Sequence, residues 1–558
     1  MNEGIKLQRR ICVLFACILL LNMIGCAGGA PDLSDGVIQE PSVTPTPIPL
    51  ASPTATPASP LVWMSPDLPT SFIASIQLPT DWILIQTRQD ATLQIEIGHE
   101  NPISDWVYAL VAPFPTVNDG IASTDLIDLW LFGSDEGTSN RQLLVSRNTL
   151  AVFSRLWGVP SSQTVIAVPE NQLLGRAWSE KNAWAIIPFE EIQPEWKVLE
   201  VDGISPIHKE FGAELYPLTI PISILGDHSA LVAELNKITD GGFTAIVPTS
   251  NRDPQRLTTL IMTGVTALVR ATAALMQYRG MTYPGQDIRE WLHQADLTHI
   301  NNEVPFSSRC PRYPARVDDL TFCSMPETIE LLDDIGADII ELSGDHLADW
   351  GPEAMLYTLD LYKERGWRVY GGGENREAAR KPLLIEHNGS RLAFLGCNAK
   401  GPGYARAAEN YPGAALCDMD QLQSEIQRLR ADDYLPIVTF QHHEVYTYGI
   451  NPALQTDFRK AAQAGALIVS GSQAHQPHAM EFYEGAFIHY GLGNLFFDQY
   501  DEGFPMRQAF IDRHVFYNNR HINTELLTVM FVDYARPRPM TSEERRDLLE
   551  VIFNASGW

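Results

Sequence analysis

Carboxylate, amide and imidazole side chains gather in five short segments of the chain, each near the end of an apolar run. These segments are 263-TGVT-266, 296-DLTHINNE-303, 344-GDHLAD-349, 440-FQHHE-444 and 471-GSQAH-475. Carboxylates and imidazoles that converge from separate loops can hold a divalent metal ion or act as an acid/base pair. A single aspartate or histidine is more often a helix cap or a satisfied core residue, so the prediction of a shared site depends on their common placement.

The segments must be positioned by strands and helices, and the pattern around them is that of an α/β sheet. Apolar strands are expected over 257–265, 337–346, 390–399, 435–444 and 466–475, with a helix over 352–366. Apolar strands that end in polar or glycine loops are typical of a sheet buried between helix layers. Because chemistry in such sheets gathers at the carboxyl ends of the strands, the polar segments are expected to meet there.

Longer motifs in the same region follow one another in the order found in a known family. They are 295-ADLTHINNEVP-305, 342-LSGDHLADWG-351, 371-GGGENREAARKPLLIEHNGSRLAFLG-396, 464-AGALIVSGSQAHQ-476 and 490-YGLGNLFFDQ-499. Residues 255–500 therefore resemble the CapA family, the poly-γ-glutamate capsule biosynthesis proteins. The resemblance implies a calcineurin-like metallophosphoesterase fold, which is a four-layer α/β/β/α sandwich. It also implies a divalent metal such as Mn or Zn, an anionic polymer or phosphoester substrate, and a role in capsule polymer biosynthesis or surface attachment.

The resemblance also implies site residues, position by position. The catalytic residues are His346 as general acid, Glu303 as base or metal ligand, and Asp349. The metal ligands that it implies are Asp296, Asn301, Asp345, His442, His443, Gln473 and His475. His478 lies beyond the family's ligand position and is expected to take no part.

The sequence departs from the family pattern at several of these positions. Val265 stands where the family has a metal-holding aspartate, and Gln473 stands where it has a histidine. A further histidine is either replaced by Gln441 or displaced to His442 or His443. A two-metal site clamps a hydroxide and the phosphoryl oxygens between cations, so these losses favour one metal ion or none. The remaining side chains are enough for one Zn, Mn or similar ion, or for metal-free hydrolysis by a Glu–His pair.

Two kinds of function follow. The first is a metallophosphoesterase-like hydrolase with an altered metal site. The second is a non-catalytic lipoprotein that binds an anionic ligand or polymer through its N-terminal domain, residues 61–250. This α/β domain resembles type 2 periplasmic substrate-binding proteins in 107-VYALVAPFPTVND-119 and 184-WAIIPFEEIQPEWKVLEVDG-203. An interaction domain with a closed cleft is the alternative for it.

The N-terminus predicts export and a lipid anchor. A basic stretch precedes the apolar run 11–25, which has the length of a signal peptide. The run ends in 23-MIGC-26, which resembles a bacterial lipobox and makes Cys26 the candidate for lipidation. An uncleaved anchor helix is the alternative, and either one places the body outside the cytoplasm at the cell membrane. Residues 26–60 are rich in Pro and Thr and are expected to form an extended spacer.

Cysteine and charge usage agree with this placement. Four cysteines follow the anchor, and an even number in an exported protein suggests two disulfides. Short loops favour Cys310 with Cys323 and Cys397 with Cys417, whereas a zinc site of all four thiolates is disfavoured because no CxxC occurs. The formal net charge of −28 argues against a nucleic-acid partner.

Residues 501–558 are expected to be a C-terminal extension packed on the second domain. The segment 541-TSEE-544 has the pattern of a helix start and predicts a terminal helix. His514 and His521 are expected to be surface or core residues rather than metal ligands.

Overall fold

The computed structural model describes residues 59–80, 82–133, 141–226, 247–312 and 320–558 of the chain. The predicted signal peptide, Cys26 and nearly all of the linker lie outside the described residues, so their predictions stay predictions. Among the helices that the structure describes, none is long and apolar enough to cross a membrane.

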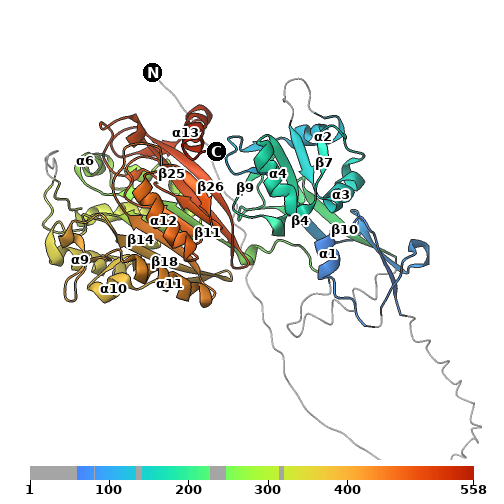
Figure 1. Ribbon diagram of the computed structural model, residues 1–558, viewed down its shortest axis with the longest axis horizontal. Coiled ribbons are helices and arrows are strands. Elements are labelled where there is room, and N and C mark those ends of the chain that lie inside the picture. The colour runs from blue at the N-terminus through green and yellow to red at the C-terminus, as the bar shows by residue number, and fades with distance from the viewer. Residues whose placement is uncertain (1–58, 81, 134–140, 227–246, 313–319) are drawn as a thin grey trace, which may run out of the picture. The chain divides into compact units, whose positions relative to one another are not determined.

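Residues 61–226 build one mixed sheet with short helices around it (Figure 1). The strands lie in the order β2-β1-β3-β10-β4-β8-β6-β7, with β9 pairing with β4 and β5 with β9. Their bounds are β1 (Leu61–Met64), β2 (Ile83–Leu84), β3 (Leu93–Ile97), β4 (Pro102–Pro113), β5 (Gly120–Ile121), β6 (Gln142–Val145), β7 (Val165–Ala167), β8 (Ala183–Pro188), β9 (Trp196–Val201) and β10 (Thr219–Gly226). The helices are α1 (Thr70–Ser75), α2 (Ser123–Leu131), α3 (Arg147–Trp157) and α4 (Leu173–Glu180).

A second sheet begins at Leu257 and carries the first half of the predicted site. Its strands lie in the order β15-β14-β13-β11-β25-β26-β27, and β12 pairs with both β13 and β24. Their bounds are β11 (Leu257–Thr263), β12 (Val265–Thr266), β13 (Leu297–Asn302), β14 (Ile339–Glu341), β15 (Arg368–Tyr370), β24 (Asn494–Phe496), β25 (Gln508–Tyr517), β26 (Arg520–Phe531) and β27 (Pro537–Pro539). The pairs β11–β13, β13–β14 and β14–β15 are parallel, so their carboxyl ends share one edge.

A third sheet carries the other half of the predicted site. Its strands lie in the order β17-β18-β20-β21-β23-β22, and β18, β20, β21 and β23 pair in parallel. Their bounds are β17 (Leu383–His387), β18 (Ser390–Asn398), β20 (Leu435–Gln441), β21 (Ile468–Gly471), β22 (Met480–Tyr483) and β23 (Ala486–His489), and the two-residue strands β16 (Gly372–Gly373) and β19 (Gly413–Ala414) pair separately.

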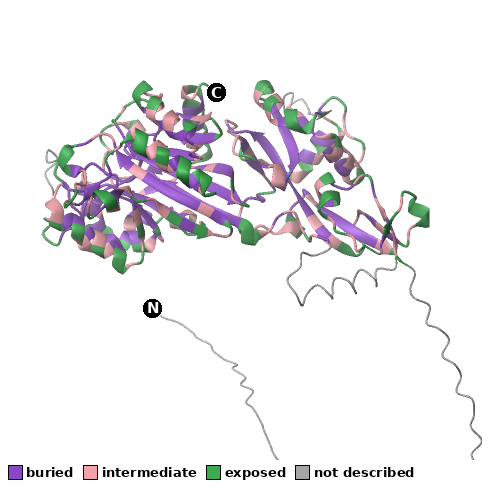
Figure 2. Ribbon diagram, turned by 60° about the horizontal axis from the view of Figure 1, so that its bottom comes forward, coloured by how far each residue is buried: buried purple, intermediate pink, exposed green. Residues whose placement is uncertain are grey.

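Helices cover the outer faces of these two sheets. They are α6 (Arg270–Arg279), α7 (Arg289–His293), α8 (Glu330–Asp334), α9 (Gly351–Glu364), α10 (Arg376–Arg380), α11 (Met419–Ala431), α12 (Pro452–Gln463) and α13 (Ser542–Ala555). The strands are buried along most of their length, while the helices turn exposed faces outward (Figure 2).

Three apolar clusters define the layers. Leu260 and Phe394, from the second and third sheets, belong to one cluster without helical residues, so the two sheets pack face to face. Met355 of α9 packs with strands of the second sheet, and Phe458 of α12 packs with strands of the third. The order of layers is therefore α/β/β/α, which confirms the predicted α/β fold class. Burial on both faces explains why the strands are nearly continuous apolar runs.

The C-terminal residues differ from the expectation of an outer extension. β25 pairs antiparallel with the whole of β11 and with β26 on its other side. These strands complete the second sheet, and His514 and His521 are buried within it. The predicted terminal helix is present as α13, with a capping box between Thr541 and Glu544.

Two disulfides tie loops to this framework. The structure joins Cys310 to Cys323 and Cys397 to Cys417, which is the pairing that the short loops favoured. The first disulfide holds the segment that leads into Phe322, and the second links the end of β18 to the start of α11.

Candidate active site

Side chains from several strand ends converge where the second and third sheets terminate. Glu303 follows β13, Asp345 and His346 follow β14, Lys400 follows β18, Gln441 ends β20, and Gln473 and His475 follow β21. Because β13 and β14 run parallel in one sheet, and β18, β20 and β21 run parallel in the other, their carboxyl ends bring these residues to one place. Gly344 permits the approach, since a Cβ at that position would lie 2.7 Å from the Glu303 Cα.

The Gln441 side chain lies at the centre of the site. It is fully buried, and its Nε2 donates to Glu303 Oε1 at 2.8 Å and to Asp345 Oδ1 at 2.9 Å. The same amide nitrogen contacts the Gln473 side-chain oxygen Oε1. The sequence left open whether the family's histidine is replaced by Gln441 or displaced to His442 or His443. In the structure Gln441 is the residue at the end of β20 that contacts Glu303 and Asp345.

Lys400 supplies a second N–H group to the same carboxylate. Its Nζ lies 2.9 Å from Asp345 Oδ2 and 2.7 Å from Glu444 Oε1. Burial lowers the lysine pKa, but the charges of Asp345 and Glu444 outweigh it and raise the pKa above its usual value. Both oxygens of Asp345 therefore face side-chain N–H donors.

His346 is held as a protonated imidazole. Its Nδ1 donates to Asp349 Oδ2 at 2.7 Å, while its Nε2 lies 3.7 Å from Asp345 Oδ2. Burial opposes the charge, but the bond to Asp349 and the neighbouring Asp345 raise the pKa of His346 to about 9. The ring also packs on Phe322, with centroids 4.7 Å apart, and the Phe322 backbone N–H donates to Asp349. Ring orientation is thus fixed from two sides.

Glu303 is a carboxyl group whose surroundings disfavour its charged form. It is fully buried, and burial together with the negative charge of Asp345 raises its pKa to about 7. A carboxyl group with such a pKa exchanges its proton near neutral pH, which suits a general base. Glu303 and His346 therefore form a base and an acid on either side of Asp345.

His475 and Glu444 complete the site. His475 Nδ1 lies 2.9 Å from Asn494 Oδ1, and its Nε2 lies 3.5 Å from Glu444 Oε1. Burial lowers the pKa of His475, but Glu444 and Glu303 outweigh it and raise the value. The hydrogen bond with His475 and the one with Lys400 hold the pKa of Glu444 well below its usual range. Gln473 donates to the same carboxylate at 2.8 Å.

Asp296, proposed as a metal ligand, lies elsewhere. It precedes β13, where Lys209 and the Thr259 hydroxyl bind its carboxylate. Glu303 follows the other end of this six-residue strand, so about 20 Å of extended chain separates the two carboxylates. Asp296 therefore belongs to the amino edge of the sheet, and its assignment to the site is wrong.

Neither of the two histidines after Gln441 has a hydrogen bond or ion pair with Glu303 or Asp345 among the described residues. His442 Nε2 lies 3.2 Å from Asp457 of α12, and the exposed His443 packs edge-on against His442. Side chains at the end of a strand alternate between faces, so Gln441 and His442 cannot both face Glu303. The assignment of His442 to the site is therefore wrong, while that of His443 stays a prediction.

Asn301 lies next to the site but is turned toward the backbone. Its Nδ2 donates to the Ser472 carbonyl, while its Oδ1 is buried without a hydrogen-bond partner among the described residues. His478 is buried, and burial lowers its pKa to about 4.

The donor set does not fit the two-metal site that the family resemblance implies. Within the described ranges, no group of three or more His, Cys, Asp or Glu side chains has the arrangement of a metal site. The Val265 side chain offers no ligand atom, and the Gln441 and Lys400 nitrogens occupy the space against Asp345 where a cation would bind. The positive charge next to this carboxylate comes from the protein itself.

Lys400 and Phe322 are the site residues that sequence reasoning missed. Lys400 is the only charged side chain in 392-LAFLGCNAK-400 and follows an apolar strand. Its position at a strand end could therefore have predicted a place in the site. Phe322 carries no comparable signal, since its position depends on the Cys310–Cys323 disulfide and on its contact with His346.

Comparisons with known proteins identify a family match for residues 259–499. They match the model described as "Bacterial capsule synthesis protein PGA_cap". The capsule biosynthesis protein CapA of Bacillus anthracis is 24% identical over 307 residues, which cover 53% of this chain and 73% of that protein. The PGA biosynthesis protein CapA of Bacillus subtilis is 29% identical over 177 residues, 31% of this chain and 46% of that protein.

Solved structures give weaker likenesses. A 5'-nucleotidase precursor from Thermus thermophilus is 14% identical with a TM-score of 0.31, covering 52% of this chain and 58% of that one. An ABC-type phosphate transport receptor from Vibrio cholerae is 11% identical with a TM-score of 0.22, covering 25% of this chain and 68% of that one. We infer nothing about activity from likenesses at these scores.

Proposed function

Because residues 259–499 carry a bacterial capsule synthesis domain, which confirms the CapA resemblance, we propose that the protein acts on an anionic capsule polymer at the cell surface. The polymer is poly-γ-glutamate or a related polycarboxylate, and the reaction is metal-independent hydrolysis of one of its amide bonds. The observation that carries this proposal is the Asp345 carboxylate, both of whose oxygens are bound by side-chain nitrogens of Lys400 and Gln441.

Glu303 and His346 supply the proton transfers. Glu303 in its ionised form takes a proton from a water molecule, which then attacks the amide carbon. The His346 imidazolium gives its Nε2 proton to the departing amine, while Asp349 holds the ring through Nδ1. After one turnover Glu303 is protonated and His346 is neutral, and exchange with solvent restores both groups.

The polymer's own charge is matched by the cations of the site. Lys400 and His346 have raised pKa values and stay positively charged at neutral pH, and Glu444 and Glu303 also raise the pKa of His475. A carboxylate of the substrate can share these cations with Glu444 and Asp345, so recognition is electrostatic. A phosphoester is the less suitable substrate, because its hydrolysis in this fold class relies on metal ions that clamp the phosphoryl oxygens.

We further propose that the protein is an extracytoplasmic lipoprotein of the cell membrane. The 23-MIGC-26 segment supports lipidation at Cys26, and the two disulfides of the described domain are typical of an oxidising compartment. Metabolic labelling with a radioactive fatty acid tests this, with Cys26→Ala as the comparison. Label that persists in Cys26→Ala, or protein that remains in the cytoplasm, contradicts the anchor.

Hydrolysis is tested with the purified full-length protein in detergent. Poly-γ-glutamate is incubated with the protein in excess EDTA, and new amino groups and chain length are measured. We expect shortening of the polymer that EDTA does not inhibit and that Glu303→Gln abolishes. Glu353→Gln is the matched control, since the Glu353 side chain is 81% exposed on α9. Activity that EDTA abolishes and Mn²⁺ restores would show that the reaction depends on metal.

A non-catalytic polymer-binding protein is the second candidate function. The observation that favours it is the mutual pairing of Lys400, Glu444 and His475, which already satisfies much of the site's charge. In this case calorimetry shows poly-γ-glutamate binding that survives His346→Ala, while no amino groups are released by the unmodified protein. Release of amino groups under those conditions excludes this candidate.

A further inference from the structure

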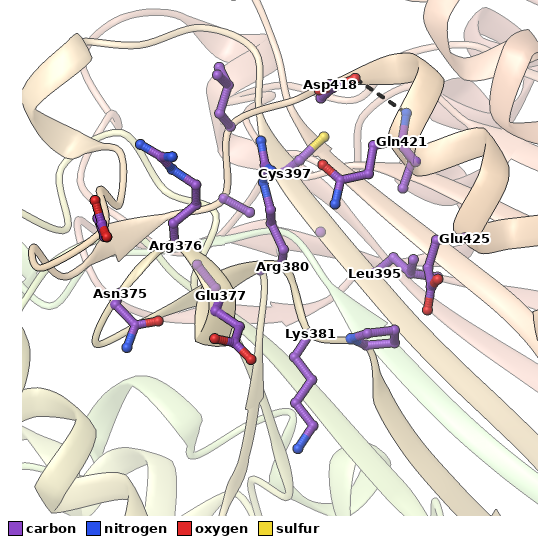
Figure 3. A pocket seen from close by; sticks show the side chains of 18 residues that line it. Asn375, Arg376, Glu377, Arg380, Lys381, Leu395, Cys397, Asp418, Gln421 and Glu425 are labelled. Atoms are coloured by element: carbon purple, nitrogen blue, oxygen red, sulfur yellow. Dashed lines mark hydrogen bonds between the residues drawn. The ribbon is translucent and has the colours of Figure 1, made fainter.

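A cavity lies between α10 and α11, outside the candidate active site. It has a volume of about 990 Å³ and is floored by Leu395, Gly396 and Cys397 of β18 (Figure 3). The Cys397–Cys417 disulfide fixes the wall where β18 meets the start of α11. The cavity is therefore built on rigid elements, and no residue of the active site described above lines it.

Three cations of one short segment line the cavity without a matching acid. Arg376, Arg380 and Lys381 form no ion pair with any residue in the described part of the chain, and the Arg380 Nε is buried without a hydrogen-bond partner there. Figure 3 shows the Arg380 side chain in the middle of the cavity, with Arg376 on one side and Gln421 on the other. A buried guanidinium nitrogen without an acceptor costs free energy unless a ligand supplies one.

The acids of the cavity indicate what else the ligand carries. Two of its carboxylates are engaged, since Glu425 pairs with Arg428 at 2.7 Å and Asp418 caps α11 through the Gln421 N–H. Glu377 and Glu409 form no ion pair among the described residues, and both are exposed. The cavity thus offers cations at its centre and free hydrogen-bond acceptors at its rim.

We propose that this cavity binds a glutamyl segment of the polymer, with a carboxylate on Arg380 and Arg376 and an amide N–H toward the acidic rim. A γ-linked glutamyl unit carries both groups, one free carboxylate and one amide N–H per unit. The inference rests on the proposed polymer substrate. A phosphate ion would meet the cations but would gain nothing from Glu377 and Glu409.

The cavity also adjoins the active-site loop. Gly371 lines the cavity and has a φ of +73°. A Cβ added to Gly371 would lie 3.4 Å from the Cβ of Ser343, which is two residues before Asp345. The Asn398 amide donates to the Ser343 carbonyl at 3.0 Å, so β18 supports the same loop. The cavity therefore packs against the base of the loop that carries Asp345.

Calorimetry with γ-linked triglutamate tests the site on the full-length Glu303→Gln protein, in which binding is read without turnover. We expect Arg376→Gln and Arg380→Gln each to weaken binding about tenfold or more, as for the loss of a charge-assisted bond. Arg546→Gln, on the outer surface of α13, is the control for charge. Since Arg376 is exposed, its substitution leaves the fold intact even if Arg380→Gln does not fold.

Three outcomes of this calorimetry distinguish the possible roles of the cavity. Equal affinity in Arg376→Gln and Arg546→Gln overturns the site. If free glutamate binds in an Arg376-dependent way and triglutamate does not, the cavity is a carboxylate site but the polymer is not its occupant. Failure of hydrolysis in the earlier assay, with Arg376-dependent binding retained, leaves this site standing while the proposed reaction falls.

Discussion

Replacing Lys400 by alanine separates a site whose cation is a side chain from one that needs a metal ion. Lys400 contacts Asp345 at 2.9 Å and Glu444 at 2.7 Å, and its side chain is 25% exposed. Its removal leaves two carboxylates near Glu303 without their nearest positive charge. We expect the variant to be less stable than the unmodified protein and to acquire an affinity for divalent cations.

The size of the destabilisation follows from these contacts. At an effective dielectric constant of 20, each contact contributes a gross attraction of about 6 kcal/mol, most of which desolvation offsets. Removing one partner of a fully buried pair typically costs about 3–5 kcal/mol. The partial exposure of Lys400 and Glu444 screens the pair, so we expect Lys400→Ala to lower the free energy of unfolding by about 2 kcal/mol.

Thermal unfolding in EDTA and in Mn²⁺ measures both effects. Lys363→Ala is the matched control, because Lys363 lies exposed on α9 and forms no ion pair with a described residue. In Lys400→Ala, Mn²⁺ at one hundred times its dissociation constant should restore about 2.7 kcal/mol. The unmodified protein and Lys363→Ala should show no such gain, since the Lys400 ammonium excludes the cation.

Two results refute this reasoning. If Mn²⁺ stabilises the unmodified protein as much as Lys400→Ala, a metal ion fits beside the lysine and the site is a metal centre after all. If Lys400→Ala unfolds at the same temperature as Lys363→Ala in EDTA, the two short contacts contribute nothing and the carboxylates are compensated in another way.

Three further predictions concern proton transfer and pH. Glu303→Gln should lower the rate of polymer hydrolysis at least about 100-fold, measured as released amino groups, because an amide cannot accept the proton of water. The rate of the unmodified protein should rise with pH through about 7 as Glu303 ionises and fall above about 9 as His346 loses its proton, and a flat profile over this range contradicts the assignment. His521→Gln should reduce the pH dependence of stability between pH 6.5 and about 4. Burial lowers the pKa of His521 to about 4. As the pH falls from 6.5, the unfolded chain therefore binds a proton at this histidine before the folded protein does, and the free energy of unfolding decreases. Urea unfolding at several pH values should show a slope smaller by about 1.4 kcal/mol per pH unit.

Much of the second and third sheets was predictable because their strands are buried on both faces. The apolar runs at 257–265, 390–399 and 435–444 became β11, β18 and β20 within a few residues of the expected bounds. β25 and β26 were missed because charged and polar side chains interrupt their apolar pattern, and Asp512 and His514 are buried through specific partners. Period and hydropathy do not reveal such partners, which depend on residues distant in the chain.

The site was predictable where a residue lies at a strand end or in the loop that follows it. Glu303, Asp345, His346 and His475 meet as expected, since parallel strands deliver their carboxyl ends to one edge. The assignment of Asp296 to the site is wrong because the six residues of β13 lie between Asp296 and Glu303, so the two carboxylates are at opposite ends of this strand. The choice among Gln441, His442 and His443 depends on which face of β20 each residue occupies, and the end of a strand can shift by one residue.

The departures from the family pattern compensate one another in charge. The CapA resemblance puts Val265 at the position of a metal-holding aspartate and Asp345 at that of an asparagine, so one carboxylate is lost and another is gained. The negative charge around the centre is therefore kept although its position has moved to the loop after β14. At that new position Lys400 reaches the carboxylate, and Gln441, standing in for a neutral imidazole, donates to its other oxygen. A lone loss of ligands would leave buried carboxylates repelling one another, which is strongly destabilising. The three substitutions together instead keep Glu303 and His346 beside Asp345, whose charge contributes to raising both of their pKa values, and this supports the proposed acid and base without a metal ion.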